Sequence, residues 1–162
     1  MDIEITELLQ KIVDEAPMGI YVLDTERKIV FWSTGAERIT GYSREEMVGR
    51  YCFEGMLNHI DREGVHLCHD FCPMMATIFD GQSREQPVFL KDRTGQRIPV
   101  MVHTEPLFKG QETLGLLNIS GFCRNVNILC RKNGDTHDSG TDSASGSSAD
   151  AGTSAGRYPD LS

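Results

Sequence analysis

The sequence predicts an α+β domain: a five-stranded antiparallel sheet with short helices on one face and an amphipathic helix at the N-terminus. Three observations lead to this prediction. Five segments rich in β-branched and aromatic residues are bounded by polar turns. Several short helical patterns fall together between the second and the third of these segments. Residues 133–162 contain almost no large apolar side chains, so the folded part ends well before the C-terminus.

The first expected element is an amphipathic helix over residues 3–15. Acidic residues stand in its first turn, where the helix dipole favours them. Its apolar residues recur at helical spacing, so they share one face. Pro17 cannot continue the helix, and this element therefore occupies residues 1–16. The apolar residues are Ile5, Leu8, Leu9, Ile12 and Val13.

Two β-rich runs follow, over residues 19–24 and 28–33. The polar turn at residues 25–27 joins them, and this arrangement is typical of an antiparallel hairpin.

Short helices are expected in the central part of the chain. One covers residues 34–43, with Gly41 at a C-cap position. Ser43 and Glu46 fit a capping box that begins the next helix. Pro73 suits the first turn of a further helix, which Asp80 and Gly81 would end. Residues 50–71 show no clean periodicity.

Three further β-rich runs cover residues 85–91, 96–108 and 113–119. In the second run, residues expected in the core alternate with residues expected near solvent, which is typical of a sheet with one buried face. Val100, Val102 and Thr104 alternate with Met101, His103 and Glu105.

Composition divides the rest of the chain. The folded domain is expected over residues 17–120, followed by a linker-like segment at 121–132 and a disordered tail at 133–162 rich in Gly, Ser, Ala and Asp.

The net charge of -8, without a cluster of Lys and Arg, argues against nucleic-acid binding. No apolar run approaches the roughly 20 residues of a membrane span, and no signal peptide is present. We therefore expect a cytoplasmic protein, whose five cysteines are free thiols, ligands or redox groups.

Three stretches of the chain stand out together: residues 16–33, residues 36–50 and residues 91–100, with Gly115 in the final strand. They resemble the signature blocks of PAS domains. The resemblance implies a sensory or dimerisation module that relays a signal to an output such as a histidine kinase, a cyclic-di-GMP enzyme or a transcription regulator. No GGDEF-like run, kinase motif or DNA-reading helix is recognised in residues 120–162, so we do not expect an enzyme.

Cysteines and histidines concentrate in the aperiodic segment. Cys68 and Cys72 would share one face if this segment were helical. Thiolates and imidazoles are preferred ligands of zinc and iron–sulfur clusters, and a single imidazole can also bind non-covalent haem. The spacing of the cysteines and histidines in this segment also resembles that of a Cys-rich subgroup of PAS domains found ahead of GGDEF diguanylate cyclase domains. The candidate cofactor-binding residues are Cys52, Cys68, Cys72, His59 and His66, with the three cysteines as metal ligands and His69 as a further possible haem ligand.

Two functions remain open from the sequence. The first is a sensory PAS module that binds a ligand, metal or redox cofactor and relays a conformational signal to a partner or to an output domain. The second is a cofactor-free interaction or dimerisation domain whose cysteines are small core residues. For the sensory module a homodimer through the N-terminal helix and the outer face of the sheet is expected, because the apolar helix face needs a partner; the alternative is that this face covers the sheet of its own chain.

Overall fold

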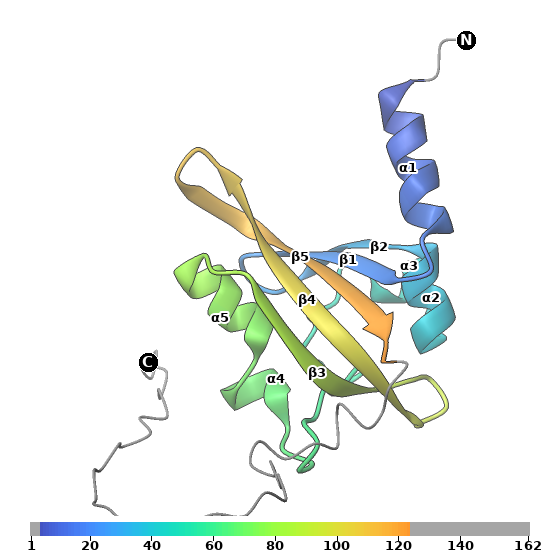
Figure 1. The fold of residues 1–162 in the computed structure, drawn as a ribbon, viewed down its shortest axis with the longest axis vertical. Helices are drawn as coiled ribbons and strands as arrows, with labels where there is room; N and C mark the ends of the chain where they lie inside the picture. Colours follow the sequence, from blue (N-terminus) through green and yellow to red (C-terminus); the bar gives the residue numbers. More distant parts are fainter. Residues whose placement is uncertain (1–3, 124–162) are drawn as a thin grey trace, which may run out of the picture. The chain divides into compact units, whose positions relative to one another are not determined.

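The computed structural model describes residues 4–123 of the chain (Figure 1). The predicted linker beyond Cys123 and the predicted disordered tail lie outside these residues. The helices are α1 (Ile5–Glu15), α2 (Thr34–Thr40), α3 (Arg44–Met47), α4 (Leu67–Asp70) and α5 (Pro73–Asp80), and the strands are β1 (Gly19–Asp24), β2 (Ile29–Trp32), β3 (Arg84–Lys91), β4 (Arg97–Lys109) and β5 (Glu112–Phe122).

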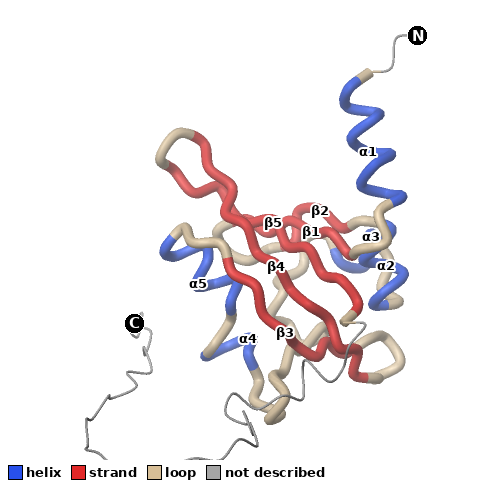
Figure 2. Tube along the Cα trace, viewed as in Figure 1, coloured by secondary structure: helices blue, strands red, loops and turns tan. Residues whose placement is uncertain are grey.

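The five strands form one antiparallel sheet in the order β2-β1-β5-β4-β3, which confirms the predicted fold class. The central strand β5 pairs with both β1 and β4, so the first and last strands of the domain lie side by side (Figure 2). The strand β5 continues through Phe122, past its predicted end at residue 119, because Phe122 still pairs with Val100 of β4.

The two faces of the sheet differ in burial, as the alternation in β4 predicts. Val100, Val102 and Thr104 are buried, whereas Met101, His103 and Glu105 are partly exposed. Helices α2 to α5 gather on the buried face, where Leu23, Trp32 and Leu116 anchor the core (Figure 1).

Local sequence signals begin and end the central helices where predicted. The Ser43 side chain accepts a hydrogen bond from the backbone of Glu46, and the Glu46 side chain accepts one from the backbone of Ser43, which completes the capping box. Gly41 ends α2 and Gly81 ends α5, each with a left-handed backbone at φ 78° and 68°.

Helix α1 has no buried side chain and extends away from the sheet (Figure 1). Asp14 attaches its C-terminal end to the rest of the domain, at 3.2 Å from the Arg44 guanidinium and 3.3 Å from the Thr34 hydroxyl. No helix among the described residues has the length and the apolar character that a membrane crossing requires.

Candidate functional site

The segment between α3 and α5 carries the predicted site and is held at several points. The backbone N–H of Cys52 donates to the carbonyl of Arg27 in the β1–β2 turn (3.0 Å). Ile60 pairs with Phe89 on the outer edge of β3 through two backbone hydrogen bonds of 2.8 and 3.0 Å. These contacts hold the segment against the sheet. Its conformation is therefore determined by pairing with distant residues and not by a periodic pattern in its own sequence.

Four of the five candidate residues lie inside the domain. Cys52, Cys68, Cys72 and His59 are buried, whereas His66 is exposed and its Nδ1 lies 2.7 Å from the Asn58 side-chain oxygen. Cys68 and Cys72 do not share a helix, because α4 ends at Asp70 and Cys72 is the N-cap of α5. Tertiary packing, and not helical spacing, therefore brings the two thiols to the same part of the core.

His59 is a neutral imidazole with an incomplete set of hydrogen bonds. Its side chain is only 6% exposed, and its Nδ1 lies 3.9 Å from the Cys68 sulfur. Its Nε2 is buried without a hydrogen-bond partner among the described residues. Burial, followed by the nearby Arg97 guanidinium, lowers the pKa of His59 from 6.5 to about 4. A buried nitrogen without a partner costs about 1–3 kcal/mol, so the site has an unused capacity to bind.

Burial favours the protonated thiol at two of the candidate cysteines, Cys52 and Cys68. Burial raises the pKa of Cys52 from 9.0 to about 12, and the nearby Cys72 adds to that rise. Burial also raises the pKa of Cys68. Only a thiolate is a strong nucleophile, so these cysteines lack the activation that catalytic or redox cysteines need.

Two small cavities adjoin His59. The first is lined by His59, Cys68, Cys72 and Met74 among others, and the second by His59, Trp32, Leu57 and Ser120 among others. Each has a volume of about 10 Å³, close to the room that one water molecule needs. The His59 ring therefore forms a wall that both cavities share.

The donor atoms do not converge as closely as a metal centre requires. Among residues 4–123, no three His, Cys, Asp or Glu side chains lie close enough together to hold a metal ion. Structural zinc sites use four such ligands in a tetrahedron. As placed, the thiols and His59 have the right chemistry for zinc or an iron–sulfur cluster but not the right spacing.

Sequence reasoning missed two residues of this region. The Arg27 guanidinium donates to the Cys68 carbonyl (2.8 Å) and stacks on Phe53 at 4.3 Å from the ring centre. Asn118 on β5 is fully buried; it accepts a hydrogen bond from the Ser120 hydroxyl, and its Nδ2 has no partner among the described residues. An Asn at an inward position of a central strand is a sequence signal for a polar site. Nothing in the sequence indicated that the Arg27 side chain contacts Cys68.

The family of the chain follows from a comparison of its sequence with known domain families. The PAS domain family matches residues 17–127. The chain belongs to the PAS family. PAS domains are generally non-catalytic sensory modules, as in histidine kinases and light-oxygen-voltage sensors. A comparison with curated proteins finds no match.

Solved PAS structures share the fold. A PAS domain from Colwellia psychrerythraea is 20% identical, with a TM-score of 0.61, covering 74% of this chain and 97% of that one. The PAS domain of nitrogen regulation protein NR(II) from Vibrio parahaemolyticus is 18% identical, with a TM-score of 0.56 over 71% of this chain and 97% of its own. VqmA bound to DPO is 17% identical, with a TM-score of 0.58, covering 75% of this chain and 60% of that one. At these identities the likeness shows the fold.

Proposed function

We propose that this PAS domain receives its signal at the cavity beside His59, Cys68 and Cys72 and relays it to a signalling partner. The observation that carries the proposal is the buried Nε2 of His59, which has no hydrogen-bond partner within residues 4–123 although two cavities adjoin this residue. A ligand that satisfies this nitrogen would be favoured over the empty site. VqmA, a protein of the same fold, is bound to DPO, which supports ligand binding as the function.

Zinc or an iron–sulfur cluster is one class of input, with Cys52, Cys68 and Cys72 as ligands and His59 as the fourth. Binding would have to displace the thiol protons and draw the side chains together, because no three donors converge in the described part of the chain. Such a rearrangement would itself be the signal, since α4 and the segment before it would move against the sheet. Haem is less favoured, since neither cavity beside His59 has room for it.

The alternative is a cofactor-free interaction domain. The small volume of both cavities favours it, because a core filled by its own side chains needs no ligand. In this alternative Cys52, Cys68 and Cys72 act as small core residues.

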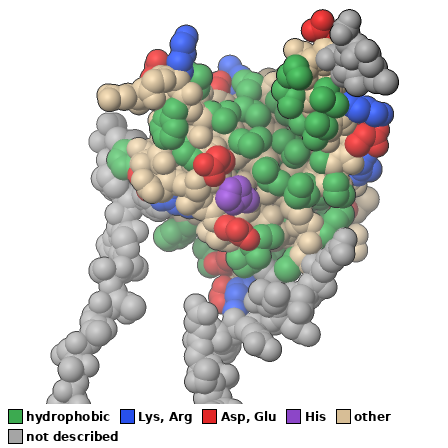
Figure 3. All heavy atoms as spheres, turned by 45° about the horizontal axis from the view of Figure 1, so that its top comes forward, with side chains coloured by type: hydrophobic (Ala, Val, Ile, Leu, Met, Phe, Trp, Pro, Cys, Tyr) green, Lys and Arg blue, Asp and Glu red, His purple; other side chains and the backbone are tan. Residues whose placement is uncertain are grey.

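A homodimer is proposed for either function. Ile5, Leu9 and Ile12 of α1 are each more than half exposed, so the helix carries an apolar face that its own domain does not cover. Hydrophobic side chains also gather over the outer face of the sheet (Figure 3). The output partner would be a histidine kinase, a cyclic-di-GMP enzyme or a transcription regulator, as the family and the predicted Cys-rich subgroup suggest.

Anaerobic purification followed by an absorption spectrum and metal analysis tests the metal input. We expect zinc or iron at stoichiometric level, lost in Cys72→Ser while the far-ultraviolet circular dichroism stays nearly unchanged. Cys123→Ser, outside the cluster, is the matched control and should keep the metal. A colourless protein without stoichiometric zinc or iron rejects the metal and favours the alternative. Light scattering that finds a monomer at high micromolar concentration rejects the dimer.

A further inference from the structure

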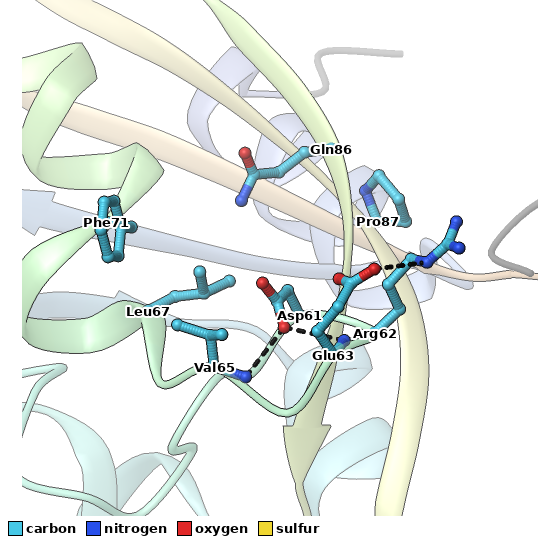
Figure 4. Close-up of a pocket in the computed structure, with 8 residues that line it drawn as sticks. All are labelled: Asp61, Arg62, Glu63, Val65, Leu67, Phe71, Gln86 and Pro87. Atoms are coloured by element: carbon cyan, nitrogen blue, oxygen red, sulfur yellow. Dashed lines mark hydrogen bonds and ion pairs between the residues drawn. The ribbon is translucent and has the colours of Figure 1, made fainter. Parts of the chain in front are cut away.

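A separate hollow lies on the surface, outside the buried site. It has a volume of about 490 Å³ and is lined by the loop after Ile60, by α4 and by β3 (Figure 4). Val65, Leu67 and Phe71 line one side of it, and Gln86 and Pro87 of β3 line the other (Figure 4). The hollow is therefore a mainly apolar groove beside β3, at the outer edge of the sheet.

The apolar walls of this groove are accessible to solvent. Phe71 is 56% exposed and Val65 is 43% exposed, although both are large hydrophobic side chains. Adjacent exposed apolar side chains around a concave surface mark a docking site more often than a solvated surface.

The described part of the chain ends close to this groove. The backbone N–H of Cys123 donates to the carbonyl of Pro99 on β4 (3.2 Å). Pro99 pairs with Phe89 on β3, and Phe89 pairs with Ile60, which precedes the groove. Three steps between neighbouring strands span about 15 Å, which about five extended residues cover. Residues 128–130 are therefore within reach of the groove without any change in the domain.

The residues that follow Cys123 match the groove in character. The segment 124–131 contains the apolar residues Val126, Ile128 and Leu129 and the basic residues Arg124 and Arg131. The rim of the groove carries Asp61 and Glu63 against one cation, Arg62, which lies 2.9 Å from Glu63. Helix α1 of a second copy is less suited, because its own charge is acidic, with Glu7, Asp14 and Glu15 against Lys11.

We propose that residues 124–131 dock in this groove of their own domain, with Ile128 and Leu129 against Val65 and Phe71 and with Arg131 near Asp61 and Glu63. This proposal does not depend on the buried site. It links the segment to α4 through Leu67, a groove residue that immediately precedes Cys68. A displacement of α4 would then change the contact between the groove and the docked segment.

Hydrogen exchange on the full chain, followed by mass spectrometry, tests the docking. The double variant Ile128→Asp, Leu129→Asp should increase exchange at residues 63–71 about tenfold, because the apolar cover of the groove is lost. Ala149→Asp, Ala151→Asp, which adds the same charge farther along the chain, is the matched control and should leave these residues unchanged. Phe71→Ser should reciprocally increase exchange at residues 124–131, and the high exposure of Phe71 makes this variant compatible with folding.

Two outcomes overturn the proposal. One is exchange at residues 63–71 that is equal in the wild type and in the double variant. The other is a cross-link between residues 124–131 and the groove that joins isotopically different copies in a mixed sample, since the occupant is then a second molecule. A cross-link confined to one molecule, together with the exchange difference, supports docking within the chain.

Discussion

Lowering the pH from 7 to 5 should destabilise the domain through His59. In the folded state its pKa is about 4, whereas the ordinary value of 6.5 applies when the chain unfolds. Below pH 6.5 the unfolded chain takes up a proton that the folded domain does not bind, so the stability is complete above pH 6.5 and falls as the pH decreases towards 4. At about 1.4 kcal/mol for each tenfold difference in proton affinity, the full loss is about 3 kcal/mol, of which about 2 kcal/mol is lost by pH 5.

Urea unfolding at a series of pH values measures this loss. Trp32 is fully buried and is the only tryptophan, so its fluorescence reports the core directly. A loss of about 2 kcal/mol should lower the urea midpoint by about 1 M between pH 7 and pH 5. In His59→Gln this part of the pH dependence should disappear, whereas His66→Gln, which removes an exposed imidazole, should retain it. If the wild type and His59→Gln lose stability equally over this range, or if an NMR titration gives His59 a pKa near 6.5, the reasoning is wrong.

Two further predictions concern the backbone around the site. Arg27→Gly should lower the unfolding free energy by about 1–2 kcal/mol in urea unfolding, because the hydrogen bond to Cys68 and the stacking on Phe53 are lost. Because glycine also relieves the positive φ of 65° at this position and regains part of that loss, Arg27→Asn, which tolerates a positive φ, is the matched variant; an unchanged midpoint in Arg27→Asn would show that Arg27 does not hold α4. Gly115→Ala should destabilise by about 3 kcal/mol or more in thermal unfolding, because the new Cβ would lie 2.0 Å from the Leu23 carbonyl oxygen. Gly110→Ala, with open space around its Cβ, is the control and should cost only about 1 kcal/mol for its positive φ; equal losses would contradict the close approach of β5 to β1.

The sequence predicted the parts of the fold that local chemistry determines. The capping box at Ser43, the helix end at Gly41 and the alternation around Val102 each depend on neighbours within a few residues, and each was confirmed. The family resemblance was confirmed as well, whereas the Cys-rich subgroup remains a prediction. The site was harder to predict because residues 50–71 carry no period, so nothing distinguished the buried His59 from the exposed His66. Only the pairing of Ile60 with Phe89 and with His66 determines which imidazole faces the core.

The position of the site between two distant parts of the sheet explains how a local event there can act on the whole domain. The segment that carries His59 is bonded to β3 through Ile60 and, at Cys52, to the turn between β1 and β2. Because β2 and β3 are the two edges of the sheet, one segment contacts both sides of it. Arg27 adds a second bond from that turn to α4, at the carbonyl of Cys68 itself. Under the proposed function, a ligand that shifts His59 or Cys68 would therefore move β3 and the β1–β2 turn together, and β1 connects back to α1, whose apolar face its own domain does not cover.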